Sequence, residues 1–189
     1  MVISLYMDRK DAITLLKKYV KSQSLLKHCL STAAVMKMTG EYLNEDSDRW
    51  EITGILHDID FETIGEDMQR HGVLGEKILL ENGVDEDIAS VIRRHNHMLF
   101  SGEYEMPVEI VLQAADSVSG LVTACALVKG GKLSAVTSKT VKKKFKDKGF
   151  AAGCERDRIK LIEPLVPLPV FYQLAIDGMM EIKDDLDLE

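Results

Sequence analysis

Apolar residues recur every three or four positions along most of the chain, which is the period of an amphipathic helix. The sequence contains no sustained alternation of apolar and polar residues, the pattern of a half-buried strand. We therefore predict an all-α bundle. Its expected helices are 8–22, 24–43, 48–58, 71–82, 85–96, 107–128, 138–148, 155–162 and 169–183.

Some ends of these helices carry recognisable signals. Asp48 with Glu51 resembles a capping box, and Pro107 suits the first turn of a helix. Gly130-Gly131 marks a flexible break between a core and a C-terminal part. We expect the acidic end of the chain, residues 181–189, to fray, because negative charge at a helix C-terminus opposes the helix dipole.

Length and composition favour one compact domain in the cytoplasm. The chain has 189 residues, of which 46% are hydrophobic, enough to bury a core. Its three cysteines, Cys29, Cys125 and Cys154, are far apart and odd in number, which suits reduced thiols. Acidic residues interrupt the N-terminus too early for a signal peptide. The apolar stretch 108–128 contains polar residues and reads as a buried helix, so we expect no membrane association.

Charge is distributed unevenly along the chain. The net charge is −7, yet residues 129–148 hold eight lysines and one acid, Asp147. A local basic segment on an acidic protein favours a small anion as ligand over nucleic acid, which usually binds a basic domain. A solvated, lysine-rich helix face is the competing interpretation.

Histidines and aspartates occupy positions that helical periodicity assigns to the core. His95 follows Ile88, Val91 and Ile92 on one face, and Asp116 lies within a long apolar helix. A buried carboxylate without a partner is costly. Several imidazoles and carboxylates buried together are explained economically by a metal ion, which replaces the water that each ligand gives up.

The order of these residues resembles the H…HD…D signature of the HD-domain metal-dependent phosphohydrolase superfamily. His28 comes first, His57-Asp58 lies within GILHDID, and Asp116 lies within QAADSVSG. The resemblance implies a helical HD bundle over the whole chain, 1–189, with a metal-binding core at about 20–130. The basic segment and C-terminal helices, 131–189, would form a small extension. That extension, with KTVKKKFKDKGFAAGCERDRI, resembles a bacterial and archaeal branch of predicted HD hydrolases, which identifies no substrate.

The resemblance also implies a set of metal ligands. One divalent ion would be held by His28, His57, Asp58 and Asp116. His71 in HGVLGEKIL and His95 in IRRHNH are similar to the extra histidines of members that hold two ions, with Asp58 bridging. His97 is a weaker candidate. The metal could be Mn, Fe, Co, Ni or Zn, since mixed histidine and carboxylate sites accept all of these.

The implied activity is hydrolysis of a phosphomonoester or phosphodiester, on a nucleotide or another small phosphorylated metabolite. Metal-activated hydroxide would attack phosphorus. Asp58 and Asp60 are the candidate catalytic carboxylates, and Glu62 is also close in sequence, although acids after a helix are often plain loop residues. The candidate cations for the phosphate are Arg93, Arg94, Lys139, Lys142 and Lys143.

Two departures and two alternatives limit this interpretation. Asp60 stands where many relatives have glycine, and the glycine-containing signature of cyclic dinucleotide phosphodiesterases is absent, which argues against that activity. Four histidines and two aspartates also resemble the di-iron HD oxygenases. A non-catalytic metal- or anion-binding regulatory module is the other alternative. The sequence does not set the oligomeric state.

Overall fold

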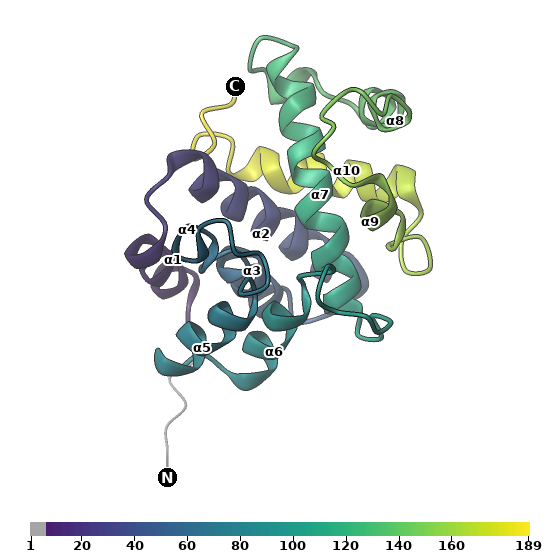
Figure 1. The fold of residues 1–189 in the computed structure, drawn as a ribbon. Helices are drawn as coiled ribbons and strands as arrows, with labels where there is room; N and C mark the ends of the chain where they lie inside the picture. Colours follow the sequence, from purple (N-terminus) through teal and green to yellow (C-terminus); the bar gives the residue numbers. More distant parts are fainter. Residues whose placement is uncertain (1–6) are drawn as a thin grey trace.

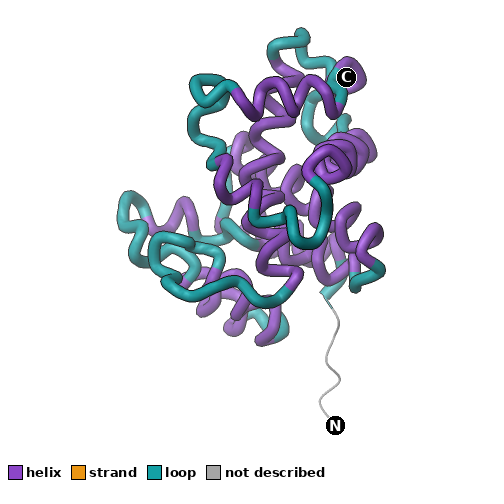
Figure 2. The backbone as a smooth tube through the Cα atoms, turned by 90° about the vertical axis from the view of Figure 1, so that its right-hand side faces the viewer, coloured by secondary structure: helices purple, strands orange, loops and turns teal. Residues whose placement is uncertain are grey.

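The computed structural model describes residues 7–189, and within that range it contains helices and loops but no strand (Figures 1 and 2). The expected all-α bundle is confirmed. In chain order the helices are α1 (Arg9–Tyr19), α2 (Gln23–Leu43), α3 (Ser47–Leu56), α4 (Phe61–Ile64), α5 (Val73–Glu81), α6 (Glu86–Arg94), α7 (Pro107–Leu127), the 3-10 helix η1 (Leu133–Ala135), α8 (Ser138–Lys146), α9 (Arg156–Lys160) and α10 (Leu168–Glu181).

Helix α2 runs between two apolar cores. One side of α2 contributes Leu26, Cys29 and Ala33 to a core shared with α1, α3, α5 and α6. Another contributes Val35 and Met36 to a core built around α7 and α10. The first core contains the N-terminal helices and the second contains the C-terminal ones, on opposite sides of α2 in Figure 1.

Helix α3 lies very close to α2 because small residues face each other. A Cβ added to Gly54 would stand 2.5 Å from the Ala33 Cα, closer than real atoms approach. The side chain of Asp46 begins α3 by accepting a hydrogen bond from the Arg49 amide. The predicted capping box of Asp48 and Glu51 is therefore wrong: the cap lies two residues earlier, and Asp48 falls in the first turn.

Helix α7 has the length and hydropathy of a membrane span, but two thirds of its most apolar window is buried inside the bundle. It contacts α2 on one side and α8, α9 and α10 on others. Pro107 occupies its first turn, as expected. The apolar surface of α7 is thus used to join the C-terminal helices to the rest of the molecule.

The C-terminal residues do not fray, contrary to the sequence-based expectation. Leu186 and Leu188 are buried, the Glu189 amide donates to the Gly131 carbonyl, and the Ser134 amide donates to the Glu189 carbonyl. Burial of two leucines outweighs the repulsion among the acids. The chain therefore folds back across the end of α7, where Figure 1 places its terminus.

Candidate metal centre

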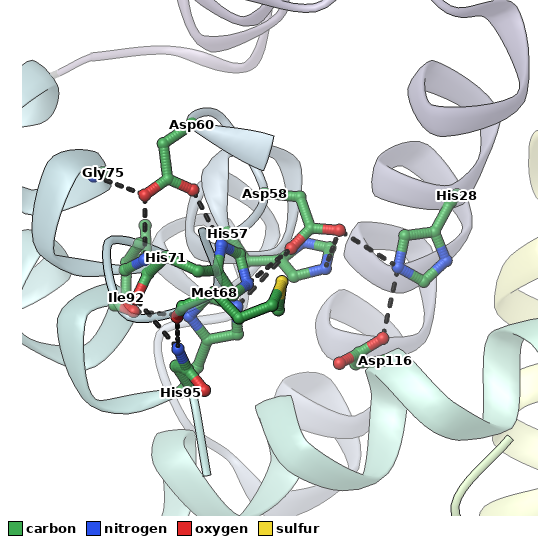
Figure 3. A network of polar contacts seen from close by, with 12 residues as sticks. His28, His57, Asp58, Asp60, Met68, His71, Gly75, Ile92, His95 and Asp116 are labelled. Carbon is green, nitrogen blue, oxygen red and sulfur yellow. Dashed lines mark hydrogen bonds and ion pairs between the residues drawn. The ribbon is translucent and has the colours of Figure 1, made fainter. Parts of the chain in front are cut away.

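The six residues predicted as metal ligands come together in one network of polar contacts (Figure 3). They belong to α2, the C-terminal end of α3, the turn before α5, the C-terminal end of α6, and α7. We call this set the cluster; its members are His28, His57, Asp58, His71, His95 and Asp116.

Asp58 lies at the centre of the cluster, and its two oxygens face two different sets of histidines. Its Oδ2 is 3.6 Å from the Nε2 of His28 and 3.5 Å from that of His57. Its Oδ1 is 3.4 Å from the Nε2 of His71 and 3.5 Å from that of His95. The donor atoms of each set lie within 4.8 Å of one another. Asp58 is thus arranged as a carboxylate shared by two three-residue sites.

These separations suit a shared cation better than direct hydrogen bonds. Hydrogen bonds between nitrogen and oxygen span about 2.7–3.2 Å. Two donors that are each about 2.0–2.2 Å from one ion at a tetrahedral angle stand about 3.4 Å apart. The Asp58–histidine distances of 3.4–3.6 Å fall near the second value.

Backbone carbonyls orient two of the imidazoles. The Nδ1 of His57 lies 2.8 Å from the Gly54 carbonyl, and the Nδ1 of His95 lies 2.5 Å from the Ile92 carbonyl. A carbonyl only accepts, so each Nδ1 donates its proton to the carbonyl, and the Nε2 of each ring faces Asp58. Both Nε2 atoms are buried and lack a hydrogen-bond partner within residues 7–189. Buried ring nitrogens without a hydrogen-bond partner are what a metal ion satisfies, so these residues fit the ion that the sequence predicts.

Asp60 orients His71 by contacting the Nδ1 of the ring, while the Nε2 of the ring faces Asp58. Its Oδ1 lies 2.8 Å from the Nδ1 of His71, and its Oδ2 accepts from the amides of Gly72 and Gly75, each at 2.8 Å. The carboxylate is fully buried and turned away from Asp58 (Figure 3). We expected Asp60 to act directly on water or a leaving group; its contacts instead fix the orientation of a histidine.

The apolar periodicity predicted that a helix begins at His71, but His71 lies before the helix. Helix α5 starts at Val73, and Gly72 has a φ of +81°. A Cβ on Gly72 would stand 2.7 Å from the Arg93 carbonyl oxygen. The sharp turn at Gly72 lets His71 leave the helix axis and reach Asp58.

This turn supports a prediction about Gly72→Ala. The substitution combines an unfavourable positive φ with a backbone clash, so the free energy of unfolding should fall by about 1–3 kcal/mol, measured by chemical denaturation. Gly65→Ala is the matched control, because Gly65 also has a positive φ of +62° but nothing within 4 Å of its Cβ position. Equal losses in the two variants would contradict a special role for the close approach at Gly72.

Burial and charge prepare the cluster for a cation. Burial lowers the pKa of His57 to about 4, so this ring is neutral at pH 7. Although burial raises the pKa of Asp58, the nearby histidines outweigh it and the net shift is downward. The pKa of Asp116 is also lowered, because the hydrogen bond from His28 and the charge of Arg158 outweigh burial. The states that bind a metal, neutral imidazole and ionised carboxylate, are thus favoured at His57, Asp58 and Asp116.

Arg158 is a residue of this site that sequence reasoning missed. Its Nη2 lies 2.7 Å from the Oδ2 of Asp116, whose Oδ1 is 3.2 Å from the His28 Nε2. The Arg158 Nε donates to the side chain of Gln113 at 2.7 Å, and that amide donates to the His95 carbonyl at 2.8 Å. Arg158 therefore connects both ends of the cluster to the short helix α9.

Within residues 7–189, the predicted phosphate-binding cations form ion pairs with other residues or line another cavity. Arg93 pairs with Glu76 at 2.6 Å, and Arg94 pairs with Glu109 at 3.0 Å and lies over the Phe100 ring. The three predicted lysines of α8 line a separate surface cavity of about 520 Å³, which none of the cluster residues lines; they are Lys139, Lys142 and Lys143. Of the ion pairs among residues 7–189, only that of Arg158 brings an arginine or lysine to the cluster.

Two further candidates also face other partners. The Nε2 of His97 lies 3.3 Å from the Glu155 carboxylate. The Glu62 carboxylate accepts hydrogen bonds from the amides of Lys21 and Ser22, ahead of α2. These contacts give both residues structural partners outside the cluster.

Comparison with known proteins agrees with this geometry. The family model of the HD domain matches residues 25–121, which is more than half of the chain and includes every member of the cluster. The HD domain is the mark of a superfamily of metal-dependent hydrolases, and this chain belongs to the HD-domain family. None of the curated proteins compared with the chain matches it.

Proposed function

We propose that this protein hydrolyses a phosphate ester of a nucleotide or another small metabolite, using two divalent cations. The observation that carries the proposal is the position of Asp58, with one oxygen toward His28 and His57 and the other toward His71 and His95. A shared carboxylate is suited to holding two ions close together. A cytoplasmic location belongs to the same proposal.

The residues of the cluster fall into two sets of ligands, one for each ion. His28, His57 and Asp116 would hold one ion, His71 and His95 would hold the other, and Asp58 would contact both. When bound, a pair of divalent ions supplies an activated water and neutralises charge on the phosphoryl oxygens. The protein contributes fixed ligands, because carbonyls and Asp60 hold the rings. It also contributes burial: the side chains of His57, His71 and His95 are at most 7% exposed, whereas that of His28 is 28% exposed.

The test starts with protein purified without chelators. Its bound metals are quantified, and phosphate release is then measured from p-nitrophenyl phosphate, nucleotides and sugar phosphates with added Mn, Co, Ni, Mg or Zn. We expect metal-dependent release that a chelator abolishes. Bound iron with dioxygen consumption and no phosphate release would replace the proposal with the oxygenase alternative. Stoichiometric metal without any turnover would replace it with the binding module.

A further inference from the structure

A cavity of about 410 Å³ opens beside the cluster, between α2, α7 and the C-terminal residues. Ser24, Lys27, His28 and Ser31 line it from one face of α2, since they are spaced by three or four residues. His28 belongs both to this cavity and to the cluster. A phosphate ester whose phosphoryl group lies at the cluster can therefore place its organic part in the cavity.

The opposite wall of the cavity is mostly apolar. It is formed by the last turns of α7 and by the end of the chain; its apolar residues are Ala124, Leu127, Leu186 and Leu188. Ser119 and Thr123 also line it. The volume lies within the range of small-molecule sites, about 300–1,000 Å³, and the mixture of apolar and hydroxyl groups suits a sugar or nucleoside.

Lys27 lines the cavity, and its ion-pair partner is a carboxylate of the same chain. Lys27 Nζ forms an ion pair with the Asp187 carboxylate. Asp187 is held in a left-handed conformation, φ +54°, between the buried Leu186 and Leu188. The end of the chain is thus folded so that a carboxylate reaches Lys27 at the rim of the cavity.

This ion pair is easily exchanged. The Lys27 side chain is 33% exposed and that of Asp187 is 79% exposed. Exposed pairs of this kind contribute about 0–1 kcal/mol, so a ligand anion that also binds at the cluster can displace Asp187 at little cost. A doubly charged phosphate is a stronger partner for an ammonium than a single carboxylate.

We infer that this cavity is a substrate-binding site that selects phosphate esters carrying a second anionic group, which Lys27 binds in place of Asp187. The inference rests on the proposed function for the position of the reacting phosphoryl group. It adds the class of substrate: a sugar or nucleoside with two anionic groups, one at the cluster and one at Lys27.

The experiment compares matched ligands that differ by one phosphate. Adenosine 3′,5′-bisphosphate is paired with AMP, and fructose 1,6-bisphosphate with fructose 6-phosphate. KM and kcat are measured for each ligand with the metal-loaded protein. p-Nitrophenyl phosphate, which has no second anion, reports the reaction at the cluster alone.

Lys27→Gln should raise KM at least tenfold for a bisphosphate and leave kcat nearly unchanged, since about 1.4 kcal/mol of lost binding corresponds to tenfold. The monophosphates and p-nitrophenyl phosphate should be unaffected, and Lys27→Arg should restore the preference. Asp187→Asn should lower KM for the bisphosphate. Lys132→Gln is the control, because Lys132 pairs with Glu189 on the same segment but does not line the cavity.

Three results would overturn the inference. These are an equal effect of Lys27→Gln on both members of each pair, a change with p-nitrophenyl phosphate of the same size, or a Lys132→Gln variant that behaves like Lys27→Gln. Hydrolysis of p-nitrophenyl phosphate by the unmodified protein would leave the proposed function standing in each case. Absence of hydrolysis of every ester would instead contradict the proposed function.

Discussion

Replacing Asp58 with asparagine should abolish phosphate release and remove most of the bound metal. Asp58 faces four histidines through its two oxygens, so the substitution affects both halves of the cluster at once. An amide keeps the size of the side chain but removes the negative charge that a divalent ion needs. Loss of about 4 kcal/mol of transition-state stabilisation corresponds to a roughly thousandfold lower kcat.

The measurement combines metal content with turnover of the most active ester. His97→Gln is the matched control, because His97 is paired with Glu155 and belongs to neither of the two three-residue sites. It should retain metal and activity. If the Asp58→Asn variant kept two equivalents of metal and near-normal turnover, the shared-carboxylate arrangement would be wrong.

Some of the ligands could be predicted because they are polar residues at positions where the sequence pattern favours an apolar one. His95 continues the buried face of Ile88 and Ile92, and Asp116 interrupts the most apolar helix of the chain. Such exceptions are visible without a structure, and their order matches the family signature. The sequence could therefore identify the members of the cluster and the helical fold.

The residues that support the ligands could not be predicted in the same way. Asp60 was predicted to be a catalytic carboxylate. Its role in orienting His71 could not be predicted, because that role depends on the chain turning back at Gly72, so that residues 11 and 15 positions after Asp60 contact its carboxylate. Lys139, Lys142 and Lys143 were predicted to bind phosphate because a run of lysines indicates positive charge, but the sequence does not show toward which surface those side chains point. In the structure, α8 contacts α7 and α10 and presents its lysines to another surface.

Arg158 shows the same limit most clearly. It lies 42 residues after Asp116, on a five-residue helix within a mixed run of charges, and no periodic pattern distinguishes it. Only the packing of α9 on α7 places its guanidinium against Asp116. The positive charge of Arg158, which the sequence could not single out, thus compensates the negative charge of Asp116.

Arg158→Gln should therefore be among the most damaging substitutions outside the ligands. The Arg158 side chain is 13% exposed and that of Asp116 is 18% exposed, so the pair is largely buried. Removing one partner of a buried pair costs about 3–5 kcal/mol, because the remaining charge loses its compensation. Loss of a group that orients a ligand also lowers metal affinity by about 10–100-fold.

Both effects can be measured, by chemical denaturation of the metal-free protein and by calorimetric titration with Mn or Zn. Arg156→Gln is the matched control: Arg156 is also on α9, but it donates to backbone carbonyls of residues 144–154 and does not touch the cluster. It should lower stability and leave metal affinity unchanged. If Arg158→Gln lowered stability to the same extent as Arg156→Gln and bound metal normally, Arg158 would be a purely structural residue. A selective loss of metal affinity would instead establish that the C-terminal helices take part in positioning Asp116.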